Sequence, residues 1–109
     1  MSYNPKSDET TITKNQPEVE KQLTEPPKYR VILHNDDFTP MEFVTLVLEK
    51  VFHYSSQQAQ SLMLKVHYHG SGIVGVYTYE IAEMKLVKAI SMAKRQGYPL
   101  MLSLEKETT

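Results

Sequence analysis

The stretch that decides the fold reads His34-Asn35-Asp36-Asp37-Phe38-Thr39-Pro40-Met41-Glu42, and it joins two apolar runs. Thr39 and Glu42 have the spacing of a capping box, in which side chains satisfy backbone N–H groups at the start of a helix. Pro40 falls on the first helical position, where its missing N–H costs nothing. The pattern predicts a short, rigid loop between a strand and a helix. The amide and the two carboxylates on this loop could receive a cation or a group rich in hydrogen-bond donors.

Residue periodicity on both sides of the loop predicts a small sheet covered on one face by helices. β-branched and apolar residues precede the loop, and apolar residues at helical spacing follow it. Ser55 and Gln58 form a second capping-box pattern, and Gly70 and Gly97 stand where helices are expected to end. We expect a strand over 29–34, helices over 40–52 and 56–70, a strand over 73–77, a helix over 79–97 and a strand over 99–104, with residues 105–109 frayed. This order indicates an α+β domain but not the order of the strands in the sheet.

Residues 1–27 have few large apolar side chains but five acids, three lysines and four prolines. Such a composition buries too little apolar surface to offset the entropy lost on ordering. We therefore expect a disordered N-terminal extension over 1–27 and one folded domain over 28–109, with Pro26 and Pro27 at the boundary. On composition alone, a passive solubilising role is the commoner interpretation of such an extension.

The overall composition argues against several classes of function. The 109 residues include 12 basic and 13 acidic side chains, so a formal net charge of −1 gives no footprint for nucleic acid or an anionic membrane. The chain has no cysteine, which rules out disulfides and thiolate chemistry and suits a reducing compartment. It has neither the apolar core of a signal peptide nor an apolar run near the ~20 residues of a membrane span. We expect a soluble, cytoplasmic protein.

Catalytic and metal-binding interpretations of the loop are weak. A small hydrolase could use Asp36 with His67, but no Ser, Cys or Lys is placed as an evident nucleophile. His67 and His69 would point about 200° apart on a helix and so would diverge from a shared metal. The loop also lacks the ligand spacing of an EF-hand. A polar turn that caps its own backbone stays open as the simplest interpretation.

The second predicted helix favours a binding pocket. Met63 and His67 lie one turn apart on it, and only a short connection separates it from the helix that starts near Met41. If the two helices are antiparallel neighbours, carboxylate, amide and imidazole groups share one rim above two methionines. Methionines at such positions are usually core filling, but polar acceptors above a flexible apolar floor favour a pocket.

Four stretches of the sequence carry a resemblance to a known family. They are Tyr29 to Val44, Leu62 to Gly70, Gly75 to Lys85 and Pro99 to Lys106. Together they resemble ClpS, the adaptor of the bacterial Clp protease, over residues 28–106 without an evident gap. The resemblance implies a three-stranded antiparallel sheet packed by three helices in the order β-α-α-β-α-β, with no catalytic activity and no cofactor.

The resemblance also implies a function and its partners. Adaptors of this family bind N-degrons, which are protein N-termini with a bulky apolar first residue, and so modulate the substrate choice of the protease. They deliver these substrates to the AAA+ unfoldase ClpA, which feeds the ClpP peptidase, and their N-terminal extension engages the unfoldase. We expect a monomeric adaptor whose partners are the N-terminal domain of such an unfoldase and N-degron substrates. The alternatives are a small hydrolase that uses Asp36 with His67, and an interaction domain of the ribosomal stalk type that binds no N-degron.

Site residues follow from the same resemblance. The substrate's α-amino group, a cation with three donors because its pKa is ~7.7–8.0, is expected to bind Asn35, Asp36 and a neutral His67. Asp37 shapes the loop or acts through water. The first side chain is expected to enter an apolar hole lined by Leu33, Thr39, Met41, Val44, Met63, Val66 and Leu100. Met41 at the rim should reject β-branched first residues by shape. The resemblance assigns the unfoldase contact to Glu80, Glu83 and Lys85, which spacing alone would place on a solvated helix surface.

Overall fold

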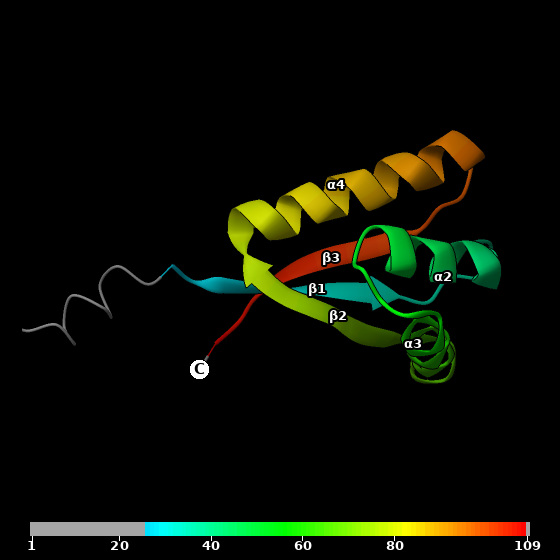
Figure 1. Ribbon diagram of the computed structural model, residues 1–109, viewed down its shortest axis with the longest axis horizontal. Coiled ribbons are helices and arrows are strands. Elements are labelled where there is room, and N and C mark those ends of the chain that lie inside the picture. Colours follow the sequence, from blue (N-terminus) through cyan, green and yellow to red (C-terminus); the bar gives the residue numbers. More distant parts are fainter. Residues whose placement is uncertain (1–25, 109) are drawn as a thin grey trace, which may run out of the picture.

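The computed structural model describes residues 26–108, which form three strands and three helices (Figure 1). The elements are β1 Lys28–His34, α2 Met41–Lys50, α3 Ser56–His69, β2 Ser71–Thr78, α4 Tyr79–Gln96 and β3 Met101–Lys106. We expected residues 105–109 to be frayed, but β3 extends to Lys106, so this expectation is wrong for residues 105 and 106. The N–H of Glu107 donates to the carbonyl of Lys28 at 2.8 Å and ties the end of β3 to β1. The predicted N-terminal extension over 1–27 falls almost wholly outside the described residues.

The central strand of the sheet is β1, in the order β2-β1-β3. It pairs antiparallel with both neighbours, with Val31 opposite Gly75 on one side and Leu104 on the other. The register with β2 shifts between Val31 and Ile32. These pairings confirm the expected three-stranded antiparallel sheet and the β-α-α-β-α-β order of the elements.

Helices cover one face of this sheet (Figure 1). α4 contacts all three strands, and its buried residues are Ala82, Ala89 and Ala93, whose small side chains let the helix approach the sheet closely. Val31 and Leu33 of β1 are buried in the same core. α2 and α3 pack against each other at the end of the sheet where β1 stops, so β1 leads directly into the space between them.

The start of α2 differs from the prediction. Its N-cap residue is Pro40, which has no side-chain acceptor, and the hydroxyl of Thr39 has no hydrogen-bond partner among the described residues. The Thr39–Glu42 capping box is therefore wrong. A carboxylate oxygen of Asp36 accepts the N–H of Thr39 at 2.7 Å, which leaves Thr39 outside the helix and its hydroxyl buried.

Both ends of α3 form as predicted. The hydroxyl of Ser55 accepts from the N–H of Gln58, and the side-chain oxygen of Gln58 accepts from the N–H of Ser55, each at 3.1 Å, so this capping box is confirmed. Gly70 ends the helix with φ 94°, in the left-handed region that favours glycine. The carbonyl of Gly70 then accepts the N–H of Asn35 at 2.9 Å. The end of α3 is thereby fixed against the loop between β1 and α2.

Candidate functional site

A cavity of about 280 Å³ lies where the β1–α2 loop, the start of α2 and the last turns of α3 meet. Its volume is near the lower limit of ligand pockets, about 300 Å³, and so suits one side chain rather than a large cofactor. The residues that line it are Leu33, His34, Asn35, Asp36, Asp37, Thr39, Pro40, Met41, Val44, Met63, Val66 and His67. Carboxylate, amide and imidazole groups therefore share one cavity with six apolar side chains.

The β1–α2 loop is a turn that Asp36 holds in shape. One of its carboxylate oxygens, Oδ1, accepts the N–H groups of Phe38 at 2.8 Å and Thr39 at 2.7 Å. The polar-turn interpretation is thus correct for this oxygen. Within residues 26–108 the other oxygen, Oδ2, accepts no hydrogen bond from the protein, and Asp36 lines the cavity. Asp36 therefore stabilises the loop with one oxygen and still offers the other to a ligand.

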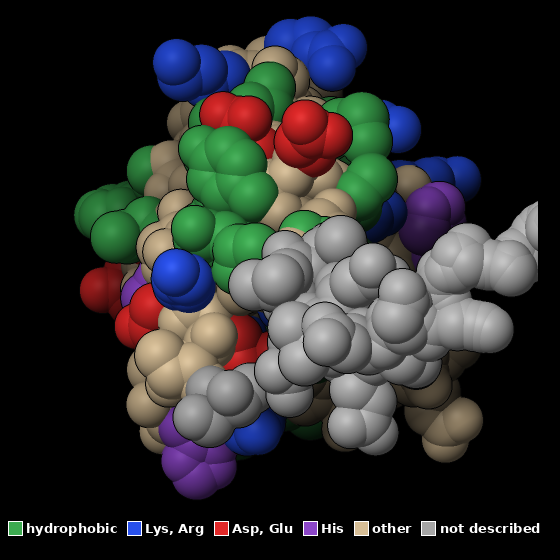
Figure 2. All heavy atoms as spheres, turned by 90° about the vertical axis from the view of Figure 1, so that its left-hand side faces the viewer, with side chains coloured by type: hydrophobic (Ala, Val, Ile, Leu, Met, Phe, Trp, Pro, Cys, Tyr) green, Lys and Arg blue, Asp and Glu red, His purple; other side chains and the backbone are tan. Residues whose placement is uncertain are grey.

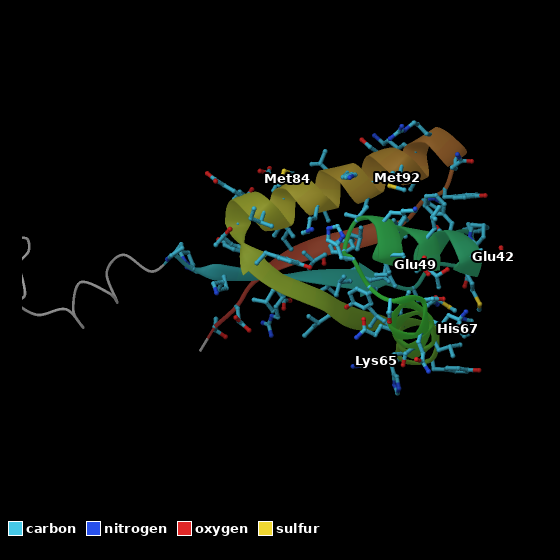
Figure 3. All side chains as sticks on the ribbon, in the orientation of Figure 1. Glu42, Glu49, Lys65, His67, Met84 and Met92 are labelled. Carbon is cyan, nitrogen blue, oxygen red and sulfur yellow. The ribbon has the colours of Figure 1, made fainter. Side chains whose placement is uncertain are left out.

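All four residues expected to bind an amine line the cavity: Asn35, Asp36, Asp37 and His67. His67 is exposed on α3. It packs edge-on against Tyr68, with ring centroids 5.1 Å apart, and lies at the same end of the molecule as Glu42 of α2 (Figure 3). His67 also belongs to the last turn of α3, where the helix dipole adds partial negative charge. A cationic group is favoured at this mouth.

Six of the seven residues expected in the apolar hole line the cavity: Leu33, Thr39, Met41, Val44, Met63 and Val66. Leu100 is not among the lining residues; it is 7% exposed and packs in the hydrophobic core. Met41 is 45% exposed, as a side chain at the rim would be.

Two lining residues, His34 and Pro40, were not among the predicted site residues. Both belong to the stretch from His34 to Glu42, and this position in the sequence could have indicated that they line the site. The ring of His34 is also bonded across to β3, with Nε2 2.7 Å from the hydroxyl oxygen of Ser103.

The three residues assigned to the unfoldase contact differ from one another in the structure. Glu80 and Glu83 are exposed on the first turns of α4, and Tyr79 donates a long hydrogen bond of 3.5 Å to Glu83. Lys85 is half-buried. Its Nζ donates to the carbonyl of Val51 at 2.9 Å and lies over an aromatic ring of Tyr77 at 5.5 Å. The amine of Lys85 is therefore engaged inside the domain, at the end of α2.

Hydrophobic side chains accompany the two acids on α4. Met84 is 60% exposed, and Val87 one turn further on is similarly exposed. Figure 2 looks at the end of the molecule where β2 leads into α4 and shows acidic side chains next to hydrophobic ones. Neither of the two cavities described within residues 26–108 is lined by these side chains.

Other chemistries find little support in the described part of the chain. Between residues 26 and 108, no three His, Cys, Asp or Glu side chains are grouped as a metal site requires. No hydrogen bond joins Asp36 to His67 there, so the hydrolase pair is not assembled. None of the helices in this range is long and apolar enough to cross a membrane.

Comparison with known proteins gives a consistent result. The family model described as "ATP-dependent Clp protease adaptor protein ClpS" matches residues 24–103. The chain belongs to the ClpS family. ClpS proteins are adaptors of the Clp protease and not enzymes, so the predicted absence of catalysis is confirmed.

Sequence relatives and a solved structure agree with this family. A ClpS adapter protein of Phenylobacterium zucineum is 48% identical over 96 residues, 88% of this chain and 84% of the relative. One from Myxococcus xanthus is 44% identical over 107 residues, 98% of each chain. The structure of Agrobacterium tumefaciens ClpS2 bound to L-phenylalaninamide superposes with a TM-score of 0.74 at 43% identity, and covers 76% of this chain and 100% of that one.

Proposed function

We propose that this ClpS-family adaptor binds N-degrons, protein N-termini that carry a bulky apolar first residue, and delivers them to a ClpA-type unfoldase for degradation by ClpP. The observation that supports the proposal most is one cavity that joins a polar mouth to an apolar floor. An N-terminal residue has the matching chemistry, because its ammonium group has three donors next to the carbon that bears the side chain.

At the mouth, the free oxygen of Asp36 and the amide oxygen of Asn35 accept hydrogen bonds from the ammonium group. His67 does the same in its neutral form, in which one ring nitrogen is an acceptor. Hydrogen bonds to a charged group are roughly twice as strong as neutral ones. The first side chain then fills the floor between Met63 of α3 and Val44 of α2.

A pair of fluorescent peptides tests this proposal. One begins with a free Phe and the other is the same peptide with its α-amino group acetylated. Acetylation removes the charge and two donors, each worth about 1.5–3 kcal/mol to a charged acceptor, so we expect binding to weaken by about 100-fold or more. Fluorescence polarisation with purified protein measures both affinities. Equal affinity for the two peptides would contradict amine recognition.

For delivery, the exposed face of α4 is the proposed contact with the N-terminal domain of the unfoldase. Glu80 and Glu83 are exposed there, so both can meet a basic partner surface. Lys85 lies beside them and contributes through the shape of the face, because its amine is bonded to Val51. The N-terminal extension engages the unfoldase during transfer, and both events take place in the cytoplasm, where the family's protease works.

A further inference from the structure

One face of the sheet carries an apolar patch that no helix within residues 26–108 covers (Figure 1). Ile32 lies between the two buried residues of β1, so its side chain points to the face opposite the core. The strand register puts Ile73 directly opposite Ile32 and puts Val76 and Met101 on the diagonals. Ile73, Val76 and Met101 are 49%, 41% and 52% exposed. We call the patch formed by these four side chains the open-face patch.

Polar side chains lie around the open-face patch. Nη2 of Arg30 is 3.3 Å from Oε1 of Glu105, and the ring of His34 is bonded to the hydroxyl of Ser103. The solvated face of an antiparallel sheet usually carries polar residues, whereas a contiguous apolar patch with a polar rim is typical of an interaction site. The side chain of Glu105 is 61% exposed, so its carboxylate is still accessible to a cation.

The sequence just before the domain has a complementary pattern. The residues at the odd positions from 17 to 23 are Pro17, Val19, Lys21 and Leu23, and those between them are Glu18, Glu20 and Gln22. Side chains alternate between the two sides of an extended chain, so this segment would have one mostly apolar side and one polar side. Lys21, on the mostly apolar side, has a charge opposite to that of Glu105.

The length and the attachment of this segment suit the open-face patch. The described part of the chain begins at Pro26, two residues before β1, so the segment is attached at one end of this face. Residues 17–23 and β1 have seven residues each, so the segment in an extended conformation is as long as the strand. A turn over residues 24–27, which include two prolines, would return the segment along the face. Attachment through a short linker also raises the local concentration of the segment to the millimolar range, which favours it over a free partner.

We propose that residues 17–23 dock in an extended conformation on the open-face patch, with Val19 and Leu23 against its apolar side chains and Lys21 near Glu105. The N-terminal extension alone buries too little apolar surface to order itself, and the patch supplies the missing surface. The contact belongs to the adaptor itself and goes beyond N-degron binding. In the proposed delivery step, the unfoldase then has to release this segment from the sheet before it engages the extension.

A nitroxide label in the segment tests the proposal in the full chain. The chain has no cysteine, so Glu20→Cys gives a single labelling site, on the side of the segment that is expected to face solvent. We expect the backbone amide signals of Ile73 and Met101 to lose most of their NMR intensity, and to recover it when ascorbate reduces the nitroxide. Met101 is the decisive signal because it pairs with His34, at the end of β1 that lies about 20 Å from the attachment point at Lys28.

Signals at the start of α4 distinguish docking from undirected motion of the segment. Thr78, just before α4, pairs with Lys28, so the first turn of α4 lies near the attachment point. A segment without a preferred contact would broaden the signal of Glu80 in this turn at least as strongly as that of Met101. Docking predicts stronger broadening at Met101, and the opposite order would overturn the proposal.

Two charge variants of the labelled chain test the side chains assigned to the contact. Leu23→Asp places a carboxylate against the apolar patch, so we expect it to restore the Met101 signal. Gln22→Asp adds the same charge on the other side of the segment, so the signal should stay broadened. Neither position lies within residues 26–108, so neither substitution alters the core of the domain. Equal Met101 signals in the two variants would overturn the proposal.

A mixed sample tests whether the patch is occupied by the segment of the same chain. The sample combines isotope-labelled chains that carry no nitroxide with nitroxide-labelled chains that carry no isotope. We expect no loss of Met101 intensity, because only the segment of the same chain is attached beside the patch. A loss in this sample would assign the patch to a second copy and overturn the proposal. No N-degron is present in these samples, so either result leaves the proposed function to the peptide titrations.

Discussion

The two candidate surfaces lie toward opposite ends of the molecule and differ in kind. At one end, α2, α3 and the loop before α2 enclose a cavity lined by carboxylate, amide and imidazole side chains together with apolar ones. At the other end, the first turns of α4 present exposed acids beside exposed hydrophobic side chains (Figure 2). The polar and apolar side chains of the first surface indicate the chemistry of its ligand, a cationic group next to an apolar one. The second is the surface proposed to contact the unfoldase.

Lys85 connects the two ends. It belongs to α4, yet its amine bonds to the carbonyl of Val51 just after α2, the helix whose first turn forms a wall of the cavity. Lys85 therefore ties α4 to the C-terminal end of α2, whereas the opposite end of α2 lines the cavity.

Substitution of Asp36 should have the largest effect. Asp36→Ala removes both the ligand acceptor and the two hydrogen bonds that shape the loop, so we expect a loss of Phe-peptide affinity of at least about 100-fold. Asp36→Asn keeps an oxygen for the loop but removes the charge, and should cost about tenfold. Polarisation titrations measure both, with Glu49→Ala as a control acid outside the cavity lining. Affinity retained in Asp36→Ala would remove this residue from the site.

Charge reversal on α4 should separate delivery from binding. In the double variant Glu80→Lys and Glu83→Lys, we expect association with the N-terminal domain of the unfoldase to weaken about tenfold or more. Calorimetric titration of the two purified proteins measures this affinity. Peptide affinity should stay within twofold, since neither residue lines the cavity and α4 begins at the opposite end of the sheet from α2 and α3 (Figure 1). A parallel loss of peptide affinity would show that the two ends are not separate sites.

Met41→Ala should widen the range of accepted first residues. Met41 is half-exposed and lines the cavity, and in the proposed function its side chain narrows the entrance for residues that branch at Cβ. We expect peptides that begin with Ile or Val to gain about fivefold in affinity, and a peptide that begins with Leu to change less. The same polarisation assay measures these ratios. If Ile and Val peptides gain nothing, Met41 does not control the entrance.

Lys85→Met tests the middle of the molecule. The substitution keeps the aliphatic chain but removes the hydrogen bond to Val51, so the free energy of unfolding should fall by about 1 kcal/mol in urea titrations. Lys88→Met is the matched control, because Lys88 is exposed on the same helix, and it should change stability little. Equal stability of the two variants would show that the hydrogen bond between Lys85 and Val51 does not stabilise the domain.

Tyr54→Phe should have the smallest effect. The Tyr54 hydroxyl donates to the carbonyl of Val74, and its loss should cost about 0.5–1 kcal/mol in the same urea titrations. Burial, followed by the nearby Tyr77, raises the pKa of Tyr54 above the ordinary value of 10.0. The raised pKa means that the folded state favours the protonated phenol of Tyr54. The contribution of this phenol to the free energy of unfolding is therefore complete below pH 10.0 and is lost as the pH rises through the folded-state pKa. A wild-type advantage that persists at still higher pH would contradict the assignment.

Much of the fold could be predicted because its signals are local. The capping box at Ser55, the glycine at 70 and the helical spacing of apolar residues each act within one or two turns, and the structure contains all three. The order of the strands depends instead on contacts between residues far apart in the chain. The Thr39–Glu42 pattern failed for a related reason: Asp36, three residues earlier, accepts the N–H of Thr39 that the Glu42 side chain would accept in a capping box.

The residues that line the cavity could largely be predicted, but the hydrogen bonds that these residues make could not. Spacing placed Met63 and His67 on one helix, and the family resemblance supplied the remaining residues. No sequence pattern could show that one oxygen of Asp36 is used within the loop, or that the Thr39 hydroxyl is buried without a partner. These features depend on how three segments meet in space, as does the inward position of the Lys85 amine.

An NMR titration with L-phenylalaninamide, a ligand with little beyond a free amine and one apolar side chain, tests the central claim most directly. Backbone amide signals report on every part of residues 26–108 at once. The proposed function predicts that saturable shifts concentrate at Asn35, Phe38, Met63 and His67, while the first turns of α4 stay unchanged, and that the acetylated ligand produces none of them. Shifts confined to α4, or equal shifts with the acetylated ligand, would contradict it.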